Sequence, residues 1–365
     1  MKAFFERRKT RQIRVGNVEI GGGAAIPVQS MTNTDTRDYA ATRAQILALK
    51  AEGCAIVRLA LPDIAAVETV RRLKAEKIGI PLVGDIHYDY RIALAAAEAG
   101  IDKIRINPGN IGSKERVAAV AEACALRHIP IRIGVNSGSL EKSILEEYGA
   151  PTPAALAESA LYHASLLEEV GFTDIALSVK ASGVPDMIAA NRLLSDRTDY
   201  PLHLGVTEAG SAHTGRTKSA VGIGTLLAEG IGDTIRVSLT ADPVLEVREG
   251  RAILSALRLL PEGGMDIISC PTCGRTRIDL IPLLAAFEKE VDRLSLRTLP
   301  IRVAFMGCAV NGLGEAHEAD VGIAGGIGEG ILFRHGEPVR KVGAEEIIPA
   351  LIAEIQKIKD EKQHG

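Results

Sequence analysis

The chain of 365 residues contains no tryptophan, and aromatic side chains make up only 3% of it. Proteins that bind RNA or single-stranded DNA commonly stack bases on exposed aromatic rings, so this scarcity argues against such a surface. The formal net charge of −3 also provides no general attraction to polyanions. Any binding of an anion must therefore depend on a local cluster of Lys and Arg.

Long apolar runs are missing as well. No apolar stretch of signal-peptide length follows the basic N-terminal residues, and no run is long enough to cross a bilayer. The remaining composition, 46% hydrophobic and 24% charged, is that of an ordinary soluble globular protein. We therefore expect a cytoplasmic protein with neither a membrane nor a nucleic acid as partner.

Cysteine is sparse and unevenly distributed, with five residues at Cys54, Cys124, Cys270, Cys273 and Cys308. In a cytoplasmic protein, close spacing of cysteines indicates a metal or redox site rather than a disulfide framework. Cys54 and Cys124 stand alone and are interpreted as small buried hydrophobic residues. The other three need a separate explanation.

Short β-branched runs alternate regularly with helical patterns over the first 260 residues or so. The predicted strands are 26–31, 55–60, 81–86, 103–107, 130–135, 174–179, 201–206 and 234–239. Predicted helices between them include 39–52, 64–77, 113–127, 154–170 and 216–230. Eight βα units of this length predict a (β/α)₈ TIM barrel. An open, doubly wound sheet is the alternative, because periodicity cannot show closure.

The Pro-Glu-Gly-Gly segment at 261–264 is a plausible domain boundary. We predict a barrel domain over 1–260 that binds the substrate, and a small α+β domain over 265–365. The smaller domain is expected to contain a strand ending at Cys270, helices at 276–293 and 344–360, and a strand at 300–305. The glycine-rich stretch 322–330 has the wrong spacing for a dinucleotide fingerprint and is better explained by tight turns.

Cations stand at the ends of five predicted barrel strands: Arg58, Arg105, Arg132, Lys180 and Arg236. Active sites of TIM barrels form at the carboxyl ends of the strands. Five cations meeting there would repel one another unless an anion joined them, and Arg is well suited to bidentate contacts with phosphate. A phosphorylated small molecule is therefore the favoured ligand. The alternative is that each cation makes a separate structural salt bridge.

Other polar residues belong to the same predicted rim: His87, Asn107, Asn110, Asn136 and Ser238. Glu208 follows the seventh strand in the sequence VTEAG. It is a candidate general acid or base, although a lone Glu among cations is as often a partner for Arg. The nearby Gly210–Thr217 segment resembles a P-loop, but Arg216 replaces the required Lys, so hydrolysis of a nucleoside triphosphate is not expected.

Cys270 and Cys273 form a CxxC motif, and Cys308 lies seven residues before Glu315. A structural zinc site would need a fourth ligand, for which His317 is available. Alternatively, three thiolates can hold three irons of a [4Fe–4S] cluster and leave one iron open to an oxygen ligand. Glu315 is the candidate for that fourth position.

At these motifs the sequence resembles the bacterial 4-hydroxy-3-methylbut-2-enyl diphosphate synthase family of the non-mevalonate isoprenoid pathway. The resemblance runs from end to end, through VQSMTNTDTRD, GDIHYD, RINPGN, RIGVNSGSL, SVKAS, LGVTEAG, SCPTCGR and GCAVNGLGE. It implies that Cys270, Cys273, Cys308 and Glu315 hold a [4Fe–4S] cluster. It also implies that the five cations line a diphosphate site, with the rim residues nearby and Glu208 as the acid/base residue.

The resemblance further implies an iron–sulfur oxidoreductase that opens 2-C-methyl-D-erythritol 2,4-cyclodiphosphate reductively to 4-hydroxy-3-methylbut-2-enyl diphosphate. Flavodoxin or ferredoxin is the implied electron donor, and a homodimer the implied assembly. Two other classes stay open on the residues alone. One is a metal-independent barrel enzyme of the aldolase or pterin-synthase type with a structural zinc site. The other is an RNA-binding module, which composition and charge already oppose.

Overall fold

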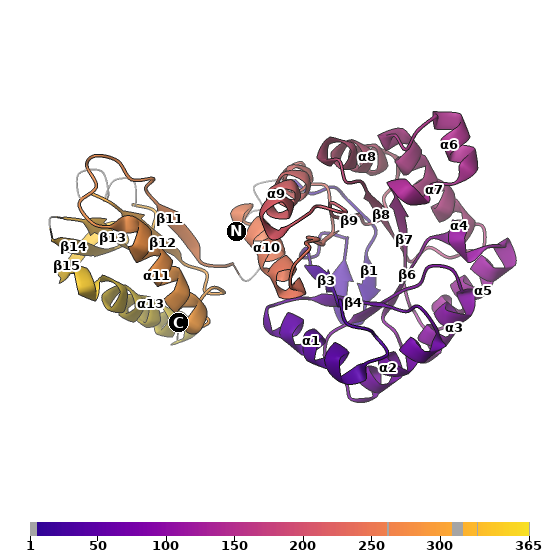
Figure 1. Ribbon diagram of the computed structural model, residues 1–365, viewed down its shortest axis with the longest axis horizontal. Coiled ribbons are helices and arrows are strands. Elements are labelled where there is room, and N and C mark those ends of the chain that lie inside the picture. Colours follow the sequence, from indigo (N-terminus) through magenta and orange to yellow (C-terminus); the bar gives the residue numbers. More distant parts are fainter. Residues whose placement is uncertain (1–5, 261–262, 309–316, 327, 365) are drawn as a thin grey trace. The chain divides into compact units, whose positions relative to one another are not determined.

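The computed structural model describes residues 6–260, 263–308, 317–326 and 328–364. The chain divides into two compact units, Met1–Leu259 and Leu260–Gly365 (Figure 1). The first contains a ring of parallel strands surrounded by helices, and the second a five-stranded sheet with two long helices. Each unit has its own hydrophobic core.

The first unit is a closed parallel barrel. Six strands pair in chain order: β3 (Gln29–Met31), β4 (Ile56–Ala60), β5 (Leu82–Asp85), β6 (Lys103–Ile106), β7 (Ile131–Asn136) and β8 (Ile175–Lys180). A parallel pair, β9 (His203–Leu204) and β10 (Thr234–Ile235), fills the gap. Parallel bridges join Leu177 to Leu202 on one side and Val28 to Ile235 on the other. The predicted TIM barrel is thus confirmed, and the open sheet is excluded.

Helices follow the strands and cover the outside of the barrel (Figure 1). Their bounds are α1 (Tyr39–Ala51), α2 (Ile64–Ala75), α3 (Tyr90–Glu98), α4 (Pro108–Ile111), α5 (Lys114–Ala125), α6 (Lys142–Tyr148), α7 (Pro153–Glu168), α8 (Val184–Arg197), α9 (Ala212–Ala228) and α10 (Pro243–Ala256). Several begin at a side chain that accepts a hydrogen bond from a free backbone N–H of the first turn, including Asp38, Asp63 and Thr152. These local signals explain why the predicted helices lie within a few residues of the observed ones.

A β-hairpin that the strand pattern did not predict closes the amino-terminal end of the barrel. It consists of β1 (Ile13–Val15) and β2 (Val18–Ile20), which pair antiparallel. Its apolar side chains pack against Ile56, Val83 and Ala176 at the amino ends of barrel strands. The opposite end, which we call the mouth, is formed by the carboxyl ends of β3–β10.

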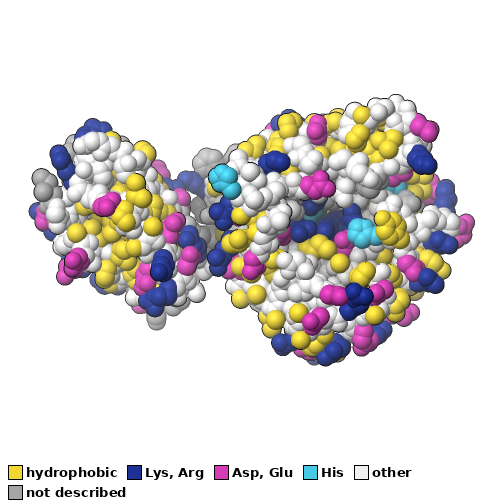
Figure 2. Space-filling view, viewed as in Figure 1, with side chains coloured by type: hydrophobic (Ala, Val, Ile, Leu, Met, Phe, Trp, Pro, Cys, Tyr) yellow, Lys and Arg dark blue, Asp and Glu magenta, His cyan; other side chains and the backbone are white. Residues whose placement is uncertain are grey.

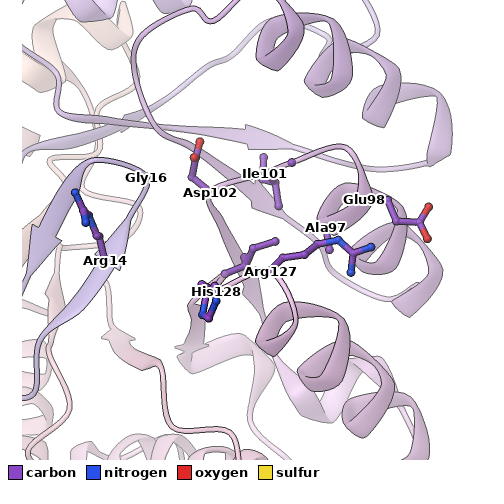
Figure 3. A pocket seen from close by; sticks show the side chains of 10 residues that line it. Arg14, Gly16, Ala97, Glu98, Ile101, Asp102, Arg127 and His128 are labelled. Atoms are coloured by element: carbon purple, nitrogen blue, oxygen red, sulfur yellow. The ribbon is translucent and has the colours of Figure 1, made fainter.

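Beside this hairpin lies a cavity of about 470 Å³ at the end of the barrel away from the mouth (Figure 3). Its lining includes Arg14, Gly16, Asp102, Arg127 and His128. The Asp102 carboxylate is already bound by Lys74 at 2.8 Å and by the Leu82 N–H. None of the five predicted cations lines this cavity.

The second unit is an α+β domain. Its sheet has the order β11 (Asp266–Ser269), β12 (Arg302–Met306), β13 (Val321–Gly325), β14 (Glu329–Arg334) and β15 (Glu337–Gly343), parallel across the first three strands and antiparallel thereafter. Helices α11 (Leu280–Arg293) and α13 (Ile347–His364) pack together, and Phe287, Phe305 and Leu351 lie fully buried in the shared core. The glycine-rich stretch belongs to β13, β14 and their connection.

Candidate active site

The five predicted cations meet inside the barrel at its mouth. Arg132 is 1% exposed and Lys180 8% exposed, and Arg105 is buried beside them. Burial lowers the pKa of Lys180 well below its ordinary value, and the positive charges of Arg236, Arg58, Arg132 and Arg105 lower it further. That mutual influence requires the five side chains to lie close together. In the space-filling view, Lys and Arg atoms line a hollow at the centre of the barrel unit (Figure 2).

A buried carboxylate that sequence reasoning missed lies between two of these cations. Asp85 ends β5, and its oxygens lie 3.2 Å from Arg105 Nη1 and 3.8 Å from Arg58 Nε. The His87 ring stands 3.4 Å away and is itself 54% exposed at the rim. Burial raises the pKa of Asp85, but Arg58, His87 and Arg105 more than offset this and hold it well below its usual range. Asp85 therefore carries a negative charge.

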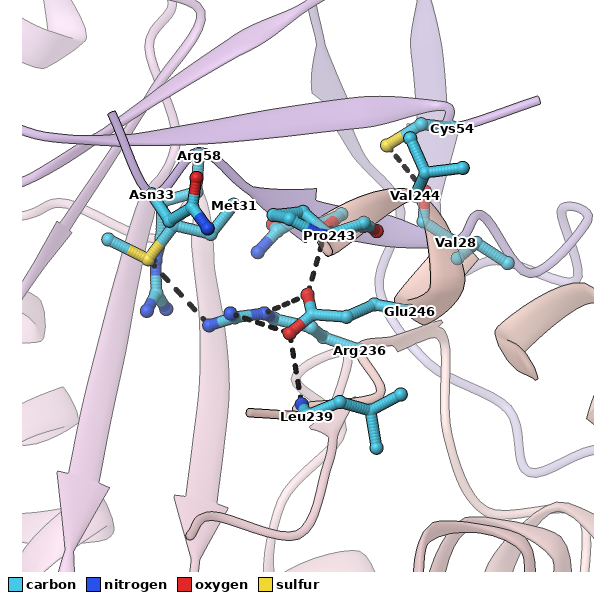
Figure 4. A network of polar contacts seen from close by, with 12 residues as sticks. Val28, Met31, Asn33, Cys54, Arg58, Arg236, Leu239, Pro243, Val244 and Glu246 are labelled. Carbon is cyan, nitrogen blue, oxygen red and sulfur yellow. Dashed lines mark hydrogen bonds and ion pairs between the residues drawn. The ribbon is translucent and has the colours of Figure 1, made fainter. Parts of the chain in front are cut away.

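A second buried carboxylate, Glu246, holds Arg236 (Figure 4). Its two oxygens each lie 3.3 Å from a guanidinium nitrogen of Arg236, in the forked geometry that suits this pair. Glu246 was also missed, because it lies on α10 and not at a strand end. The two interpretations of the cations, as separate structural salt bridges and as an anion site, therefore do not exclude each other. The cations still outnumber the two carboxylates, so the site keeps a positive excess.

Below the cations the barrel interior remains polar. Arg132 Nη1 donates to Gln29 Oε1 at 3.3 Å, and Lys103 is fully buried on β6, two residues before Arg105. Burial lowers the pKa values of Lys103 and His203, and Arg132 lowers both further. Within the described chain, Gln29 Nε2, Arg132 Nε and His203 Nε2 are buried without a hydrogen-bond partner. An interior of this kind favours a negatively charged ligand.

The predicted asparagines and serine also lie near strand ends. Asn107 directly follows β6 and is buried, and its carbonyl accepts a hydrogen bond from the Asn110 N–H at 2.9 Å. Asn136 is the last residue of β7, and Ser238 follows β10; both are half-buried. All four therefore lie on the side of the barrel where the strands end.

Glu208 differs from the other predicted residues. It lies in the connection between β9 and α9, it is exposed, and its φ of +51° places it in the left-handed region that residues with a Cβ seldom adopt. Among the described side chains it forms no ion pair with the five cations. Backbone strain of this kind often accompanies a functional position.

Two of the three clustered cysteines are brought together by neighbouring parallel strands of the second unit. Cys270 follows β11 and Cys308 follows β12, and the Cys270 N–H donates to the Phe305 carbonyl at 3.0 Å. Cys270 Sγ accepts a hydrogen bond from the Gly307 N–H at 3.2 Å, one residue before Cys308. A backbone N–H directed at a sulfur stabilises a thiolate and tunes a cluster held by it.

Cys273 completes the motif on an exposed loop. Hydrogen bonds from the backbone and the side chain of Arg275 lower the pKa of its thiol. By contrast, burial raises the pKa of Cys54 to about 11 and that of Cys124 to about 12. A metal binds the thiolate form, so the second unit and not the barrel offers suitable sulfur donors.

Three of the four predicted cluster ligands, Cys270, Cys273 and Cys308, belong to the described residues. Glu315 lies in the segment 309–316, outside the described residues. Among the side chains that are described, no three of His, Cys, Asp and Glu form a ready metal site. The donor set is nevertheless of the kind that an iron–sulfur cluster takes, because the Gly307 N–H, one residue before Cys308, donates to Cys270 Sγ, and Arg275 lowers the pKa of the Cys273 thiol.

A (β/α)₈ barrel with a cationic mouth, followed by a cysteine-bearing α+β unit, defines a two-domain enzyme class built for a small anionic substrate. A family model described as the GcpE TIM-barrel domain matches residues 10–251, and the GcpE protein C-terminal domain matches residues 266–357. The chain belongs to this family, whose curated members include 4-hydroxy-3-methylbut-2-en-1-yl diphosphate synthases (flavodoxin).

One such synthase, from Geobacter sulfurreducens, is 57% identical over 98% of this chain and 99% of its own length. Another, from Clostridium perfringens, is 56% identical over 97% of this chain and 100% of its own. Among solved structures, a type I 3-dehydroquinate dehydratase from Clostridium difficile aligns with a TM-score of 0.51. Its identity is 13%, over 68% of this chain and 98% of that chain, so the likeness concerns the fold alone. No described helix is long and apolar enough to cross a membrane.

Proposed function

We propose that the chain converts 2-C-methyl-D-erythritol 2,4-cyclodiphosphate to 4-hydroxy-3-methylbut-2-enyl diphosphate. The observation that carries the proposal is its end-to-end similarity to synthases of that name, at 57% identity over 98% of the chain. The reaction takes up two electrons, together with the protons needed to release water. The alternative, a metal-independent barrel enzyme with structural zinc, is not favoured, because the relatives match both units of the chain.

The diphosphate is proposed to bind at the mouth. Arg58, Arg105, Arg132, Lys180 and Arg236 would supply charge-assisted hydrogen bonds to its oxygens, and their positive excess would stabilise negative charge on the phosphate that leaves carbon. Further polar contacts are proposed from His87, Asn107, Asn110, Asn136 and Ser238. The polar side chains would replace water around the substrate and fix its orientation.

Cys270, Cys273 and Cys308, with Glu315, are proposed to hold a [4Fe–4S] cluster in the second unit. When bound, the cluster supplies the electrons one at a time and offers one iron without a thiolate ligand. The residues described around it have two roles in this proposal. The Gly307 N–H donates a hydrogen bond to the Cys270 sulfur, and hydrogen bonds from Arg275 lower the pKa of the Cys273 thiol.

Glu208 is proposed to exchange the proton of the reaction on the barrel side. Its support is the exposed carboxylate and the left-handed backbone at φ +51° in the β9–α9 connection. A carboxylate in this role must come within hydrogen-bond reach of the substrate oxygen. The exposed loop leaves Glu208 able to approach a ligand at the mouth.

Flavodoxin is proposed as the electron donor, on the support of the names of the curated relatives, with ferredoxin as a second carrier of the same kind. We also propose that the protein works in the cytoplasm as a homodimer. Size determination by light scattering on the cluster-loaded protein tests the dimer. A monomer at micromolar concentration would contradict it.

The decisive experiment is purification without oxygen, followed by metal analysis, electron paramagnetic resonance of the reduced protein, and turnover of the cyclic diphosphate with reduced flavodoxin. We expect about four irons per chain and activity that depends on them. C270S, C273S and C308S should each lose the iron and the activity. The matched controls C54A and C124A, which change buried cysteines of the barrel, should keep both. Zinc in place of iron in the protein purified without oxygen, or turnover of the cyclic diphosphate by iron-free protein, would refute the proposal.

A further inference from the structure

The first turn of α10 places a carboxylate at the seam where the barrel closes. Glu246 is 3% exposed, and its side chain points inward toward Arg236 and Leu239 (Figure 4). Burying a carboxylate is unfavourable unless its oxygens are fully satisfied. The hydrogen-bond donors around Glu246 therefore indicate its role.

Four donors saturate the Glu246 carboxylate. Oε2 accepts from Ser30 Oγ at 2.9 Å and from Arg236 Nε at 3.3 Å. Oε1 accepts from Arg236 Nη2 at 3.3 Å and from the Leu239 N–H at 3.1 Å. Ser30 belongs to β3, Arg236 directly follows β10, and Leu239 lies in the loop that leads to α10. One side chain thus ties together the three elements of the seam.

The backbone at this seam offers little other support. β10 has only two residues. It is joined to the segment just before β3 through the isolated Val28–Ile235 bridge, where the Ile235 N–H donates to the Pro27 carbonyl at 3.2 Å. The Arg236 N–H bonds to the Leu204 carbonyl on the opposite side. In the described chain no sheet ladder continues from 236 to 239 toward β3, so the carboxylate takes over this function.

The bond geometry also orients the guanidinium. Glu246 occupies the edge of Arg236 formed by Nε and Nη2. Nη1 is directed instead at Met31 Sδ, 3.7 Å away, and the same sulfur lies 3.0 Å from Arg58 Nε. The remaining edge of Arg236 therefore faces the other cations of the mouth.

We propose that Glu246 is a positioning residue for the reaction: it clamps Arg236 so that its Nη1 edge, beside Arg58, meets the diphosphate. This inference rests on the proposed function, and it assigns a role to a residue that touches no substrate. Without the carboxylate, Arg236 would be repelled by Arg58 and would sample other rotamers. Loss of such positioning should lower the rate of turnover while the protein still folds.

The test is a double-mutant cycle on the cluster-loaded enzyme with E246Q, R236Q and the double variant. Glutamine keeps the size of the side chain but loses the charge and one acceptor. We expect E246Q to lower kcat/KM about 10- to 100-fold. Because Glu246 acts through Arg236, the double variant should then lie within about threefold of R236Q alone. Effects that multiply would overturn the proposal and leave Glu246 a purely structural residue.

Two further variants keep the test decisive. The control variant is E249Q, which changes another glutamate of α10. It removes the ion pair between Glu249 and Arg216 of α9, and its activity should stay within about twofold of wild type. If E246Q does not fold, S30A can replace it, because this variant removes one hydrogen bond to the Glu246 carboxylate. S30A should lower kcat/KM less than E246Q, and this decrease should also vanish in the R236Q background. Calorimetry with inorganic pyrophosphate separates the two proposals. If wild-type protein fails to turn over the cyclic diphosphate, the proposed function fails, whereas non-additive loss of pyrophosphate binding would still support the clamp.

Discussion

Replacing Lys180 with methionine should make the protein more stable and less able to bind its ligand. Lys180 is 8% exposed. Burial is the main cause that lowers its pKa, and four neighbouring arginines lower it further. Its ammonium group therefore contributes unfavourably to the folded state while no anion is bound. Replacing buried charges by apolar groups of similar size commonly stabilises proteins by roughly 1–4 kcal/mol. We expect K180M to raise the free energy of unfolding of the barrel by an amount in this range.

Ligand binding should change in the opposite direction. A hydrogen bond from a charged donor contributes about 1.5–3 kcal/mol, which corresponds to a dissociation constant about 10- to 150-fold weaker once it is lost. Isothermal titration of K180M with inorganic pyrophosphate measures this loss, and urea unfolding measures the stability. The matched control is K103M, which removes a fully buried lysine deeper in the barrel. It should also stabilise the fold but change the dissociation constant less than about threefold.

The pH dependence gives an independent check. Because the pKa of Lys180 is lowered in the folded protein, the unfolded chain binds more protons between that pKa and the ordinary lysine value of about 10.4. Stability should therefore rise with pH across this window, and K180M should show a smaller rise. If K180M were less stable than wild type, or bound pyrophosphate equally well, the view of Lys180 as an unbalanced cation would be refuted.

Two other substitutions address the same cluster. D85N leaves Arg58 and Arg105 without their shared carboxylate, so the free energy of unfolding measured in urea should fall by about 3–5 kcal/mol. Adding pyrophosphate should recover part of this loss. The control variant D35N changes an exposed ion pair and should leave the unfolding midpoint unchanged. G134A adds a Cβ that would overlap the Arg105 guanidinium, so pyrophosphate binding should weaken about tenfold or more. Unchanged calorimetric affinity in G134A would show that Arg105 does not contact the anion.

The barrel could be predicted because its signals are local. Runs of β-branched residues that begin shortly after Gly or Pro alternate with capped helices, and this order alone implies parallel βα units. The last two strands are shorter than predicted: the ranges 201–206 and 234–239 reduce to His203–Leu204 and Thr234–Ile235. At the second of these the reason is visible, since Arg236 and Leu239 bond to Glu246 instead of extending a ladder. The three-residue strands of the β1–β2 hairpin are too short for a periodic pattern.

The cations of the site were predictable from their position at strand ends, but their partners were not. Ser30 and Glu246 are 216 positions apart, and no local pattern connects residues at that separation. Asp85 lies inside the GDIHYD motif, of which only His87 was predicted to belong to the site, although a carboxylate that ends a buried strand is itself a signal. Contacts between distant residues come from barrel closure, which periodicity cannot show.

The distribution of negative charge explains where a diphosphate would be held most strongly. Asp85 balances Arg58 and Arg105, and Glu246 balances Arg236. Among the described side chains, no carboxylate forms an ion pair with Arg132 or Lys180, which extend from the adjacent strands β7 and β8. The excess positive charge is therefore concentrated on that side of the mouth. An anion bound there would relieve the repulsion that Arg132 and Lys180 experience from the neighbouring cations, so part of the binding free energy is already stored in the unliganded fold.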